Sequence, residues 1–350
     1  KTDMNKKFFM GIAAMAALTL VSCSSDDLDS VSDNSSKNEA ISFDGYLGRS
    51  AVAVNGSRGS VLEIADLQKS KDGFGVFGNY NSTGGGQEFG SNLFNNVKVA
   101  YDASAETKAW TYSPLKYWPT DGHVDFLAYA PRVDNKQLKG SSIDFTVESD
   151  AANQKDLLWA NATSQTKANK TVTFNFKHAL AKIGYKVQLN GDYTGTTIKL
   201  NKITLAGSND GKGTNKAFYK TGTIDLSYTS TTSSTTKLWT PSEEKQDFEW
   251  FSGDEQLSKT PAVENPTTKY LFVIPQNFKT GTDQLYVIVE YTITYSDNTT
   301  VKTKVCKQLE KEFLQGKAYT INLTIGLTPI EFNATVYSWG DIEDYPITLE

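Results

Sequence analysis

Apolar and polar residues alternate along most of the chain, in short runs separated by clusters of Gly, Asn, Asp, Ser and Thr. The clearest strand candidates are ISFDGYL at 41–47, HVDFLAYAP at 123–131, QLYVIVEYTITY at 284–295 and AYTINLTIG at 318–326. β-Branched and aromatic residues at a period of two are typical of half-buried strands. Amphipathic helical stretches are scarce, so the pattern predicts an all-β protein made of sandwiches rather than a parallel α/β sheet.

One β-hairpin can be placed residue by residue. Six residues share a face of its first strand: Leu285, Val287, Val289, Tyr291, Ile293 and Tyr295. A turn at 296–299 follows, and Val301, Thr303 and Val305 continue the pattern on the return strand. Cys306 then falls on the opposite face, where we expect a partly exposed and unreactive thiol.

The run TVTFNFKHALAKIGYKVQL at 171–189 alternates throughout, but its phase slips by one position near Ala181 and Lys182. Such a slip indicates either a β-bulge or a strand that passes from one sheet to another. His178 lies on the apolar face with Phe176 and Leu180. We therefore expect His178 to be a hydrogen-bonded structural residue rather than a catalytic one.

The N-terminal residues have the composition of an export signal. Lys6 and Lys7 precede the apolar run FFMGIAAMAALTLV, which is too short to remain as a membrane span. The run ends in Leu-Val-Ser-Cys, which fits the lipobox of bacterial lipoproteins, so we expect residues 1–22 to be a lipoprotein signal peptide and Cys23 to be lipidated. Residues 23–40 are rich in Ser, Asp and Asn, which predicts a disordered tether.

Composition gives no reason to expect a nucleic-acid partner or an internal disulfide. The formal net charge is −5 at pH 7 and no basic block occurs, so nucleic acid is not an expected partner. The chain has two cysteines, and lipidation of Cys23 would leave Cys306 without a disulfide partner. The chain beyond the tether is long enough for two domains, which we place at residues 41–168 and 169–350.

No group of residues carries a recognisable catalytic, metal or cofactor site. The two histidines, His123 in a TDGHVD turn and His178, lack the Cys or His residues that a metal site would add. The stretch GFGVFG at 73–78 matches a dinucleotide-binding pattern, but it leads into NYNSTGGG instead of a helix that could meet a phosphate. We therefore predict that the protein is not an enzyme and holds neither metal nor cofactor.

Two further features have a functional and a structural interpretation. The runs Asn209-Asp210-Gly211 and Asp297-Asn298 could line weak calcium loops, but turns explain them better. A cluster of four aromatic residues could form a sugar-binding platform, but core or inter-sheet packing is the favoured role. These four residues are Trp110, Tyr112, Tyr117 and Trp118.

Several segments, in order along the chain, together resemble the fimbrillin-like lipoproteins of the Bacteroidetes, the subunits of type V pili. They are the LVSC leader, SRGSVLEIADLQKSKDGFGVFGNY, YWPTDGHVDFLAYAP, DLLWA, VTFNFKHALAKIGYKV, LFVIPQ, GKAYTINLTI and ATVYSWGD. The resemblance implies two tandem transthyretin-like Greek-key β-sandwich domains, the second ending in a donor strand. The run SSDD after Cys23 also resembles the signal that sends lipoproteins to the outer face of the outer membrane.

The resemblance further implies a mechanism of assembly. Such precursors are exported with a lipid anchor and cut after an arginine by a trypsin-like protease, which removes the anchor and the first strand. A C-terminal strand of the next subunit then fills the groove. Arg58 in NGSRGS best matches the cleavage position, and Arg49 in LGRSAV is the second candidate.

The two exchanged strands can be assigned by their alternating faces. The removed strand would present Ile41, Phe43, Gly45 and Leu47 on one face. The donor strand would present Ile330, Phe332, Ala334 and Val336, unless the tail YPITLE at 345–350 takes that role.

The resemblance thus predicts a structural pilin that serves adhesion at the cell surface. Its implied partners are other pilin subunits, identical or homologous, the lipoprotein export machinery, an arginine-specific protease, and a receptor on a host or bacterial surface. Two alternatives stay open. One is a surface binding protein that keeps the lipid on Cys23, and the other is a tip or anchor adhesin of a pilus, although the presence of both exchangeable strands favours a stalk subunit.

Overall fold

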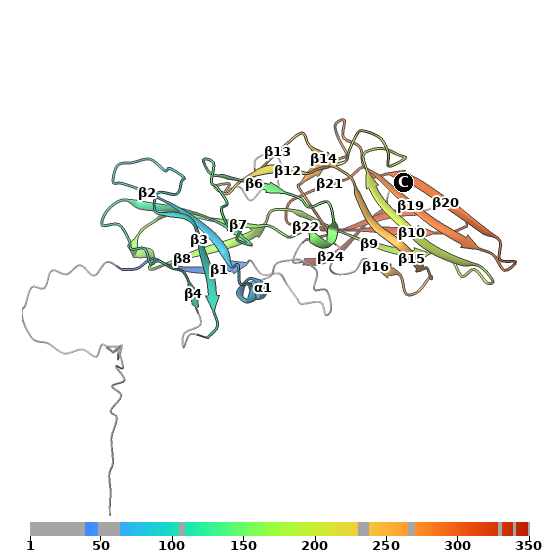
Figure 1. Cartoon of the computed structure of the whole chain (residues 1–350), viewed down its shortest axis with the longest axis horizontal. Helices are drawn as coiled ribbons and strands as arrows, with labels where there is room; N and C mark the ends of the chain where they lie inside the picture. Colours follow the sequence, from blue (N-terminus) through green and yellow to red (C-terminus); the bar gives the residue numbers. More distant parts are fainter. Residues whose placement is uncertain are drawn as a thin grey trace, which may run out of the picture. The chain divides into compact units, whose positions relative to one another are not determined.

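The computed structural model describes residues 39–47, 64–104, 109–229, 238–264, 270–327, 331–338 and 341–348. Cys23, Arg49, Arg58 and Ile330 lie outside these residues. The described chain contains one short α-helix, α1 (Ile64–Lys69), two 3-10 turns (Ala151–Asn153 and Lys167–Asn169) and otherwise strands and their connections (Figure 1). The prediction of an all-β protein is confirmed.

A seven-stranded sheet forms the N-terminal half. Its strands, in spatial order, are β1 (Ser42–Leu47), β8 (Thr171–His178), β7 (Leu158–Gln165), β5 (His123–Ala130), β2 (Phe74–Asn81), β3 (Phe94–Asp102) and β4 (Ala109–Thr111). All neighbours are antiparallel except β1 and β8, which run parallel. The sheet curls, so that the chain beside β1 meets the chain beyond β4: the Ile41 amide donates to Lys116 O at 2.9 Å.

Both faces of the central strands in this sheet are buried. One face of the sheet packs into a core rich in phenylalanine, to which Phe74, Phe126 and Phe174 belong. The opposite face contributes Phe77 and Trp159 to a second core, which continues through the C-terminal half. Strands buried on both sides explain why β5 reads HVDFLAYA with little polar interruption.

Two larger sheets form a sandwich in the C-terminal half. The first has the order β15 (Phe248–Gln256), β10 (Thr197–Ala206), β19 (Tyr286–Thr294) and β20 (Thr300–Gln308). The second has the order β16 (Val263–Glu264), β9 (Ala181–Leu189), β22 (Lys317–Ile325), β23 (Glu331–Ser338) and β24 (Asp341–Thr348), with β17 (Leu271–Val273) also paired to β9. Tyr185 of β9 packs edge-on against Trp250 of β15, with ring centroids 4.9 Å apart, and so joins the two layers.

Three small sheets complete the described chain. One contains β13 (Trp239–Pro241), β12 (Thr221–Asp225) and β6 (Ser142–Thr146). The others are the pairs β11 (Phe218–Tyr219) with β14 (Lys245–Gln246), and β18 (Gln276–Asn277) with β21 (Glu312–Phe313). Trp239 lies in the second core and donates its indole N–H to Ala179 O at 2.8 Å, which fixes the three-stranded sheet over the connection between β8 and β9.

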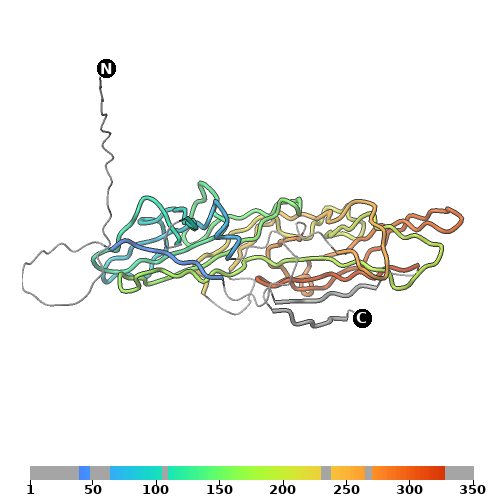
Figure 2. The backbone as a smooth tube through the Cα atoms, turned by 90° about the horizontal axis from the view of Figure 1, so that it is seen from below, coloured from blue at the N-terminus to red at the C-terminus, as the bar shows by residue number. Residues whose placement is uncertain are grey.

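The phase slip in the run at 171–189 marks a change of sheet. β8 ends at His178 in the seven-stranded sheet, and β9 begins at Ala181 in the C-terminal sandwich. Figure 2 shows this segment as a continuous tube between the two. The expected domain boundary at 168/169 falls between β7 and β8, which pair with each other, so the first sheet extends to His178. The physical reason is that Phe174 and Phe176 of β8 complete the first core.

The predicted hairpin is present. β19 and β20 pair from Tyr286↔Gln308 to Thr294↔Thr300, and the Tyr295 amide donates to Thr299 O at 2.9 Å to close the turn. The shared face of β19 is buried, with Val287 and Val289 inaccessible to solvent. Cys306 is exposed, as expected.

Candidate functional site

The strand β1 is held at the edge of the seven-stranded sheet by one ladder and one buried face. It pairs in register with β8 from Ser42↔Thr171 to Leu47↔Phe176. Its residues alternate between exposed and buried, and the four buried positions around it are the predicted Ile41, Phe43, Gly45 and Leu47. The faces of this strand therefore follow from its sequence alone.

Phe43 is the centre of the aromatic packing beneath β1. Its ring is edge-on to Phe94 and Phe126, with centroids 5.3 and 5.5 Å away, and stacks on Phe174 at 5.6 Å. A Cβ on Gly45 would meet Phe74, Trp110 and Phe176 at ordinary contact distances of 3.5–3.6 Å. The inward face of β1 therefore rests on one aromatic wall, which consists of Phe74, Phe94, Trp110, Phe126, Phe174 and Phe176.

The start of β1 is fastened by the segment that follows β4. The Trp118 amide donates to Glu39 O at 3.0 Å, and the Tyr112 hydroxyl donates to Ile41 O at 2.7 Å. A tyrosine hydroxyl is protonated at neutral pH and can therefore donate this bond, and burial raises the pKa of Tyr112 further above its ordinary value. Trp110 and Trp118 are buried. Packing is thus the main role of this aromatic cluster, as favoured from the sequence, although Tyr117 is 49% exposed.

The C-terminal strands form the far end of the six-stranded sheet. β23 pairs with β22 from Lys317↔Ser338 to Thr324↔Glu331, and β24 pairs with the other side of β23. The expected donor positions Phe332, Ala334 and Val336 therefore lie in an inner strand, opposite Leu323, Ile321 and Tyr319. The alternative donor tail begins in β24, which is the last strand of this sheet among the described residues.

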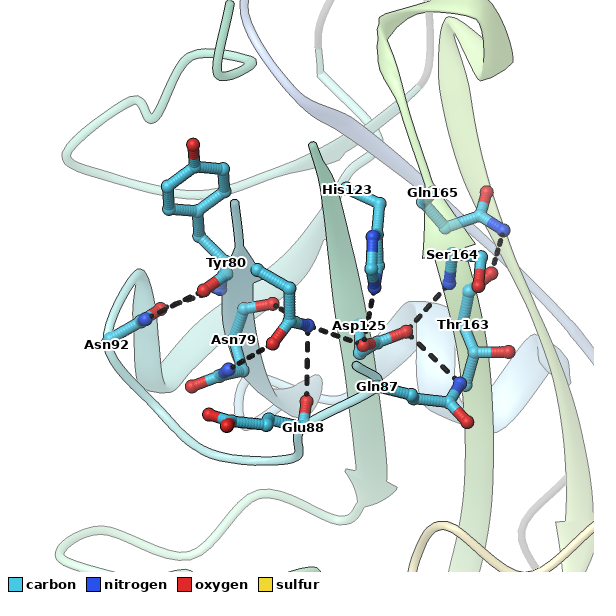
Figure 3. Close-up of polar contacts among 11 residues, drawn as sticks. Asn79, Tyr80, Gln87, Glu88, Asn92, His123, Asp125, Thr163, Ser164 and Gln165 are labelled. Atoms are coloured by element: carbon cyan, nitrogen blue, oxygen red, sulfur yellow. Dashed lines mark hydrogen bonds and ion pairs between the residues drawn. The ribbon is translucent and has the colours of Figure 1, made fainter. Parts of the chain in front are cut away.

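A buried polar cluster crosses three strands of the seven-stranded sheet (Figure 3). Asp125 of β5 is 1% exposed and accepts from the Asn81 side-chain amide at 2.6 Å and from the Ser164 backbone amide at 2.7 Å. The Gln87 side-chain amide adds a longer bond of 3.3 Å. Ser164 has a left-handed φ of 55° beside the bulge in β7, and this geometry aims its N–H at the carboxylate.

His123 is placed beside this carboxylate. The sequence placed His123 in a turn, whereas in the structure it is the first residue of β5. Its Nε2 lies 3.2 Å from Asp125 Oδ2, an ion-pair distance when the ring is protonated, although it makes no hydrogen bond among the described residues. The cluster buries a carboxylate and satisfies it mainly with neutral donors, which fits a structural role.

The second histidine makes the hydrogen bond that its position predicted. His178 Nδ1 lies 2.7 Å from Asp156 Oδ2, and both side chains are almost completely buried. Asp156 Oδ1 also accepts from the Leu157 amide at 2.8 Å. The pair lies where β8 ends and the chain turns toward β9, so it stabilises the change of sheet.

The remaining candidates for ligand binding are turns and strands. Asp210 Oδ1 accepts from Ser208, Lys212 and Gly213, and Asp297 Oδ1 accepts from the Thr299 amide. The backbone amides of Lys212 and Thr299 are the main cause that lowers the pKa of Asp210 and Asp297, respectively, and the Ser208 hydroxyl adds to the effect at Asp210. The glycine-rich match at 73–78 lies in β2, so it presents no helix N-terminus. Within the described part of the chain, no cluster of three or more His, Cys, Asp or Glu side chains could hold a metal ion.

The thiol of Cys306 should react slowly with alkylating reagents. Desolvation raises its pKa, and Lys304 only partly offsets that effect, so the thiolate fraction at pH 8 is below that of a free cysteine. We expect the midpoint of the pH–rate profile with iodoacetamide to lie above about 8.5. A matched control is a Thr300→Cys, Cys306→Ser variant, which moves the thiol to the exposed start of β20; an equal or lower midpoint for Cys306 would contradict the expectation.

The fold and the attachment of β1 define a class of protein. It is an all-β protein with a first strand that is docked as a separate piece on an aromatic wall, and with a hairpin of strands at its C-terminal end. Among the described residues, no helix is both long and apolar enough to cross a membrane.

Comparison with known proteins identifies the family. The model of the fimbrillin-like family matches residues 64–339, and the chain therefore belongs to that family. Membership places it among the subunits of cell-surface fimbriae. The match begins at the start of α1, after β1 and after both candidate cleavage sites.

The chain is also similar to individual proteins. The chain is 25% identical over 388 residues to fimbrium subunit Fim1C of Phocaeicola vulgatus, an alignment that covers 97% of this chain and 98% of the relative. Crystal structures of candidate cell adhesion proteins are also similar. That from Bacteroides ovatus has 15% identity, a TM-score of 0.48 and coverage of 88% of this chain and 99% of the other. That from Bacteroides uniformis has 16% identity, a TM-score of 0.46 and coverage of 86% and 99%.

Proposed function

We propose that this protein is a structural pilin that polymerises by strand exchange and serves adhesion at the cell surface. In this proposal the precursor is lipidated on Cys23 and carried to the outer membrane by the lipoprotein export machinery. An arginine-specific protease then cuts after Arg58, or in second place after Arg49, and β1 leaves with the anchor. A C-terminal strand of the next subunit, identical or homologous, takes the place of β1, and the finished fimbrium meets a receptor on another surface.

The observation that carries the proposal is the way β1 is attached. Its inward face packs on the aromatic wall, yet among the described strands its one full ladder is to β8. Its covalent link to the rest of the fold passes through residues 48–63. Removing it would expose the aromatic wall and the backbone groups of β8 together. Each large side chain that refills the site regains about 1.5–3 kcal/mol, so an added strand with alternating apolar residues is the natural occupant.

The distribution of arginines supports cleavage in that link. The chain has three arginines, and two of them, Arg49 and Arg58, fall between β1 and α1. The third, Arg132, donates Nε–H to Asn96 O at 3.0 Å and pairs with Asp134, and its side chain is 19% exposed. A protease that requires an extended, accessible arginine would therefore find Arg132 a poor substrate.

The positions of β23 and β24 in their sheet affect which of the two could be donated to the next subunit. β24 can detach by breaking one ladder, to β23, whereas β23 must lose its ladders to both β22 and β24. We propose that the strand with Ile330, Phe332, Ala334 and Val336 is the donor, and that β24 leaves first. The tail at 345–350 is the alternative donor. We also propose two tandem sandwich domains of transthyretin-like order, divided after β8.

The decisive experiment compares the protein sheared from cells with three variants. N-terminal sequencing, intact mass and detergent-resistant oligomer ladders are measured for the wild type, for Arg58→Ala, for Arg49→Ala and for a chain that ends at residue 327. We expect the wild-type protein to begin at Gly59 and to form oligomer ladders. The Arg58→Ala variant should retain lipidated Cys23, and the truncated chain should form no ladder. A wild-type protein that begins at Ser50 would show that the protease cuts after Arg49 instead.

Two outcomes would overturn the proposal. A wild-type protein that keeps lipidated Cys23 and stays monomeric would instead be an anchored surface binding protein or a pilus anchor. A truncated chain that still forms ladders would exclude C-terminal strand donation. Since removal of two strands could affect folding, a second truncation after residue 340 removes β24 alone, and circular dichroism checks both.

A further inference from the structure

The four-stranded sheet of the C-terminal sandwich has two open edges of opposite charge. β20, at one edge, carries Lys302, Lys304 and Lys307 and has no acidic residue within the strand. β15, at the other edge, carries three acidic residues and no basic one; these are Glu249, Asp254 and Glu255. Among the described strands, each of the two has only one partner, β19 for β20 and β10 for β15. Both outer edges are therefore available for pairing.

A first row of charged residues crosses the outer face of all four strands. Lys202 Nζ of β10 lies 2.5 Å from Glu249 Oε2 of β15. Lys202 is directly opposite Glu290 of β19, and Glu290 Oε1 lies 3.7 Å from Lys304 Nζ of β20. Lys304 also donates to Asp210 O at 3.0 Å. Along the row the charge alternates, negative on β15, positive on β10, negative on β19 and positive on β20.

A second row of polar residues also begins with an acidic residue on β15 and ends with a lysine on β20. Asp254 Oδ1 of β15 accepts from the Asn201 side-chain amide of β10 at 2.6 Å. Asn201 Oδ1 in turn accepts from the Thr292 hydroxyl of β19 at 2.6 Å, and Thr292 is opposite Lys302 of β20. This row also runs from an acid at one edge, through neutral hydrogen-bonding groups, to a lysine at the other.

Strand direction fits the same arrangement. The four strands are antiparallel to their neighbours, so β15 and β20 run in opposite directions. When a second copy is placed beside the first so that it continues the twist of the sheet, its β15 therefore meets β20 of the first copy in antiparallel orientation. The residue of β15 opposite Lys202 is Ser252, and Glu249 lies further toward the start of the strand. An equal offset of the second copy along the strands places its Glu249 beside Lys304 and continues the alternation of charge across the junction.

We infer that these two edges bind one another between copies of this chain, with β20 of one copy paired to β15 of the next. The surface is distinct from the exchanged strands of the proposed pilin, so it would join subunits of neighbouring filaments side by side. Lysines on an edge strand ordinarily prevent sheets from pairing. Here they exclude the pairing of β20 with another β20, while the acidic β15 edge accepts them.

The test uses the whole uncleaved chain, in which strand exchange has not begun, so its outcome does not depend on the proposed assembly mechanism. Sedimentation velocity is measured over a range of protein concentrations at about 20 mM and about 500 mM salt, because screening shortens the range of exposed charges to a few ångström at high salt. We expect concentration-dependent association at low salt and at least a tenfold weaker association at high salt.

Two charge reversals and their mixture provide the sharpest control. Lys302→Glu with Lys304→Glu gives a chain with two acidic edges, and Glu249→Lys with Asp254→Lys gives a chain with two basic edges. Each alone should stay monomeric, whereas an equimolar mixture should regain association, because unlike edges then meet. A Lys139→Glu, Lys220→Glu variant reverses two exposed lysines away from this sheet and should behave as the wild type.

Three results would overturn the inference. They are a wild-type chain that is monomeric at every salt concentration, a reversed variant that associates as strongly as the wild type, and a mixture that stays monomeric. The first would mean that the lysines only protect an open edge. Thermal unfolding of every variant is recorded beside sedimentation, and unchanged midpoints confirm that the reversals act on association.

Discussion

Replacing Phe43 by alanine is expected to destabilise the uncleaved protein by about 3–5 kcal/mol, the usual cost of removing a buried phenylalanine. Phe43 is 4% exposed and contacts three rings of the aromatic wall, so no neighbour can fill the space without moving. Urea unfolding followed by tryptophan fluorescence measures the change. Tyr46→Ala on the opposite, 46% exposed face of the same strand is the matched control and should change stability by less than about 0.5 kcal/mol.

The same pair of variants links stability to the proposed processing. Once β1 has been removed by cleavage, residue 43 is no longer part of the subunit. Phe43→Ala and the wild type should then have equal unfolding midpoints. A Phe43→Ala precursor as stable as the wild type would show that β1 contributes little to the closed fold, and the account of a docked first strand would be wrong.

Replacing Asp125 by alanine is expected to cost about 2–3 kcal/mol. It leaves the Ser164 amide without its acceptor and removes the shortest hydrogen bond of the Asn81 side-chain amide, whose other acceptors, Asn79 O and Glu88 O, are 3.4 Å away. Each buried donor without a partner costs about 1–3 kcal/mol. Asp125→Asn keeps one acceptor oxygen but turns an amide toward the Asn81 donor or the Ser164 donor. It should therefore be destabilised by a smaller but clear amount.

Thermal and urea unfolding of the purified precursor check this second expectation. Asp72→Ala, at an exposed position before β2, is the control for the loss of one negative charge and should leave the midpoint almost unchanged. Equal stabilities of Asp125→Ala and Asp72→Ala would mean that water replaces the lost acceptor, and the cluster would not hold the three strands together as described.

Local patterns predicted those elements whose two faces differ. The alternation in 41–47 predicted which residues of β1 are buried, and the alternation around 285–305 predicted both strands of the hairpin. The phase slip near Ala181 marked the passage from β8 to β9, because each strand must turn its apolar residues to a different core. In all three cases burial on one side leaves a period of two in the sequence.

The pairing of strands that are distant in the chain leaves no such pattern in the sequence. Nothing near β1 indicates that its partner is β8, more than a hundred residues later and parallel to it. For the same reason nothing in the sequence indicated that the expected boundary at 168/169 falls between two strands that pair, β7 and β8. Asp125 could not be recognised as buried either, since its partners Asn81 and Ser164 come from two other strands that only the sheet brings together. The charge rows across β15, β10, β19 and β20 depend equally on the register between distant strands.

The change of sheet at His178 also determines how a filament of these subunits would respond to pulling. β9 is paired in parallel with β22, and β22 with β23, while β8 borders the site of β1. In the proposed strand exchange, tension between successive subunits would enter at one sandwich, pass along the covalent chain from β9 to β8, and leave through the other. Where the load runs parallel to the strands, the hydrogen bonds of each ladder share the shear and must break together rather than one after another.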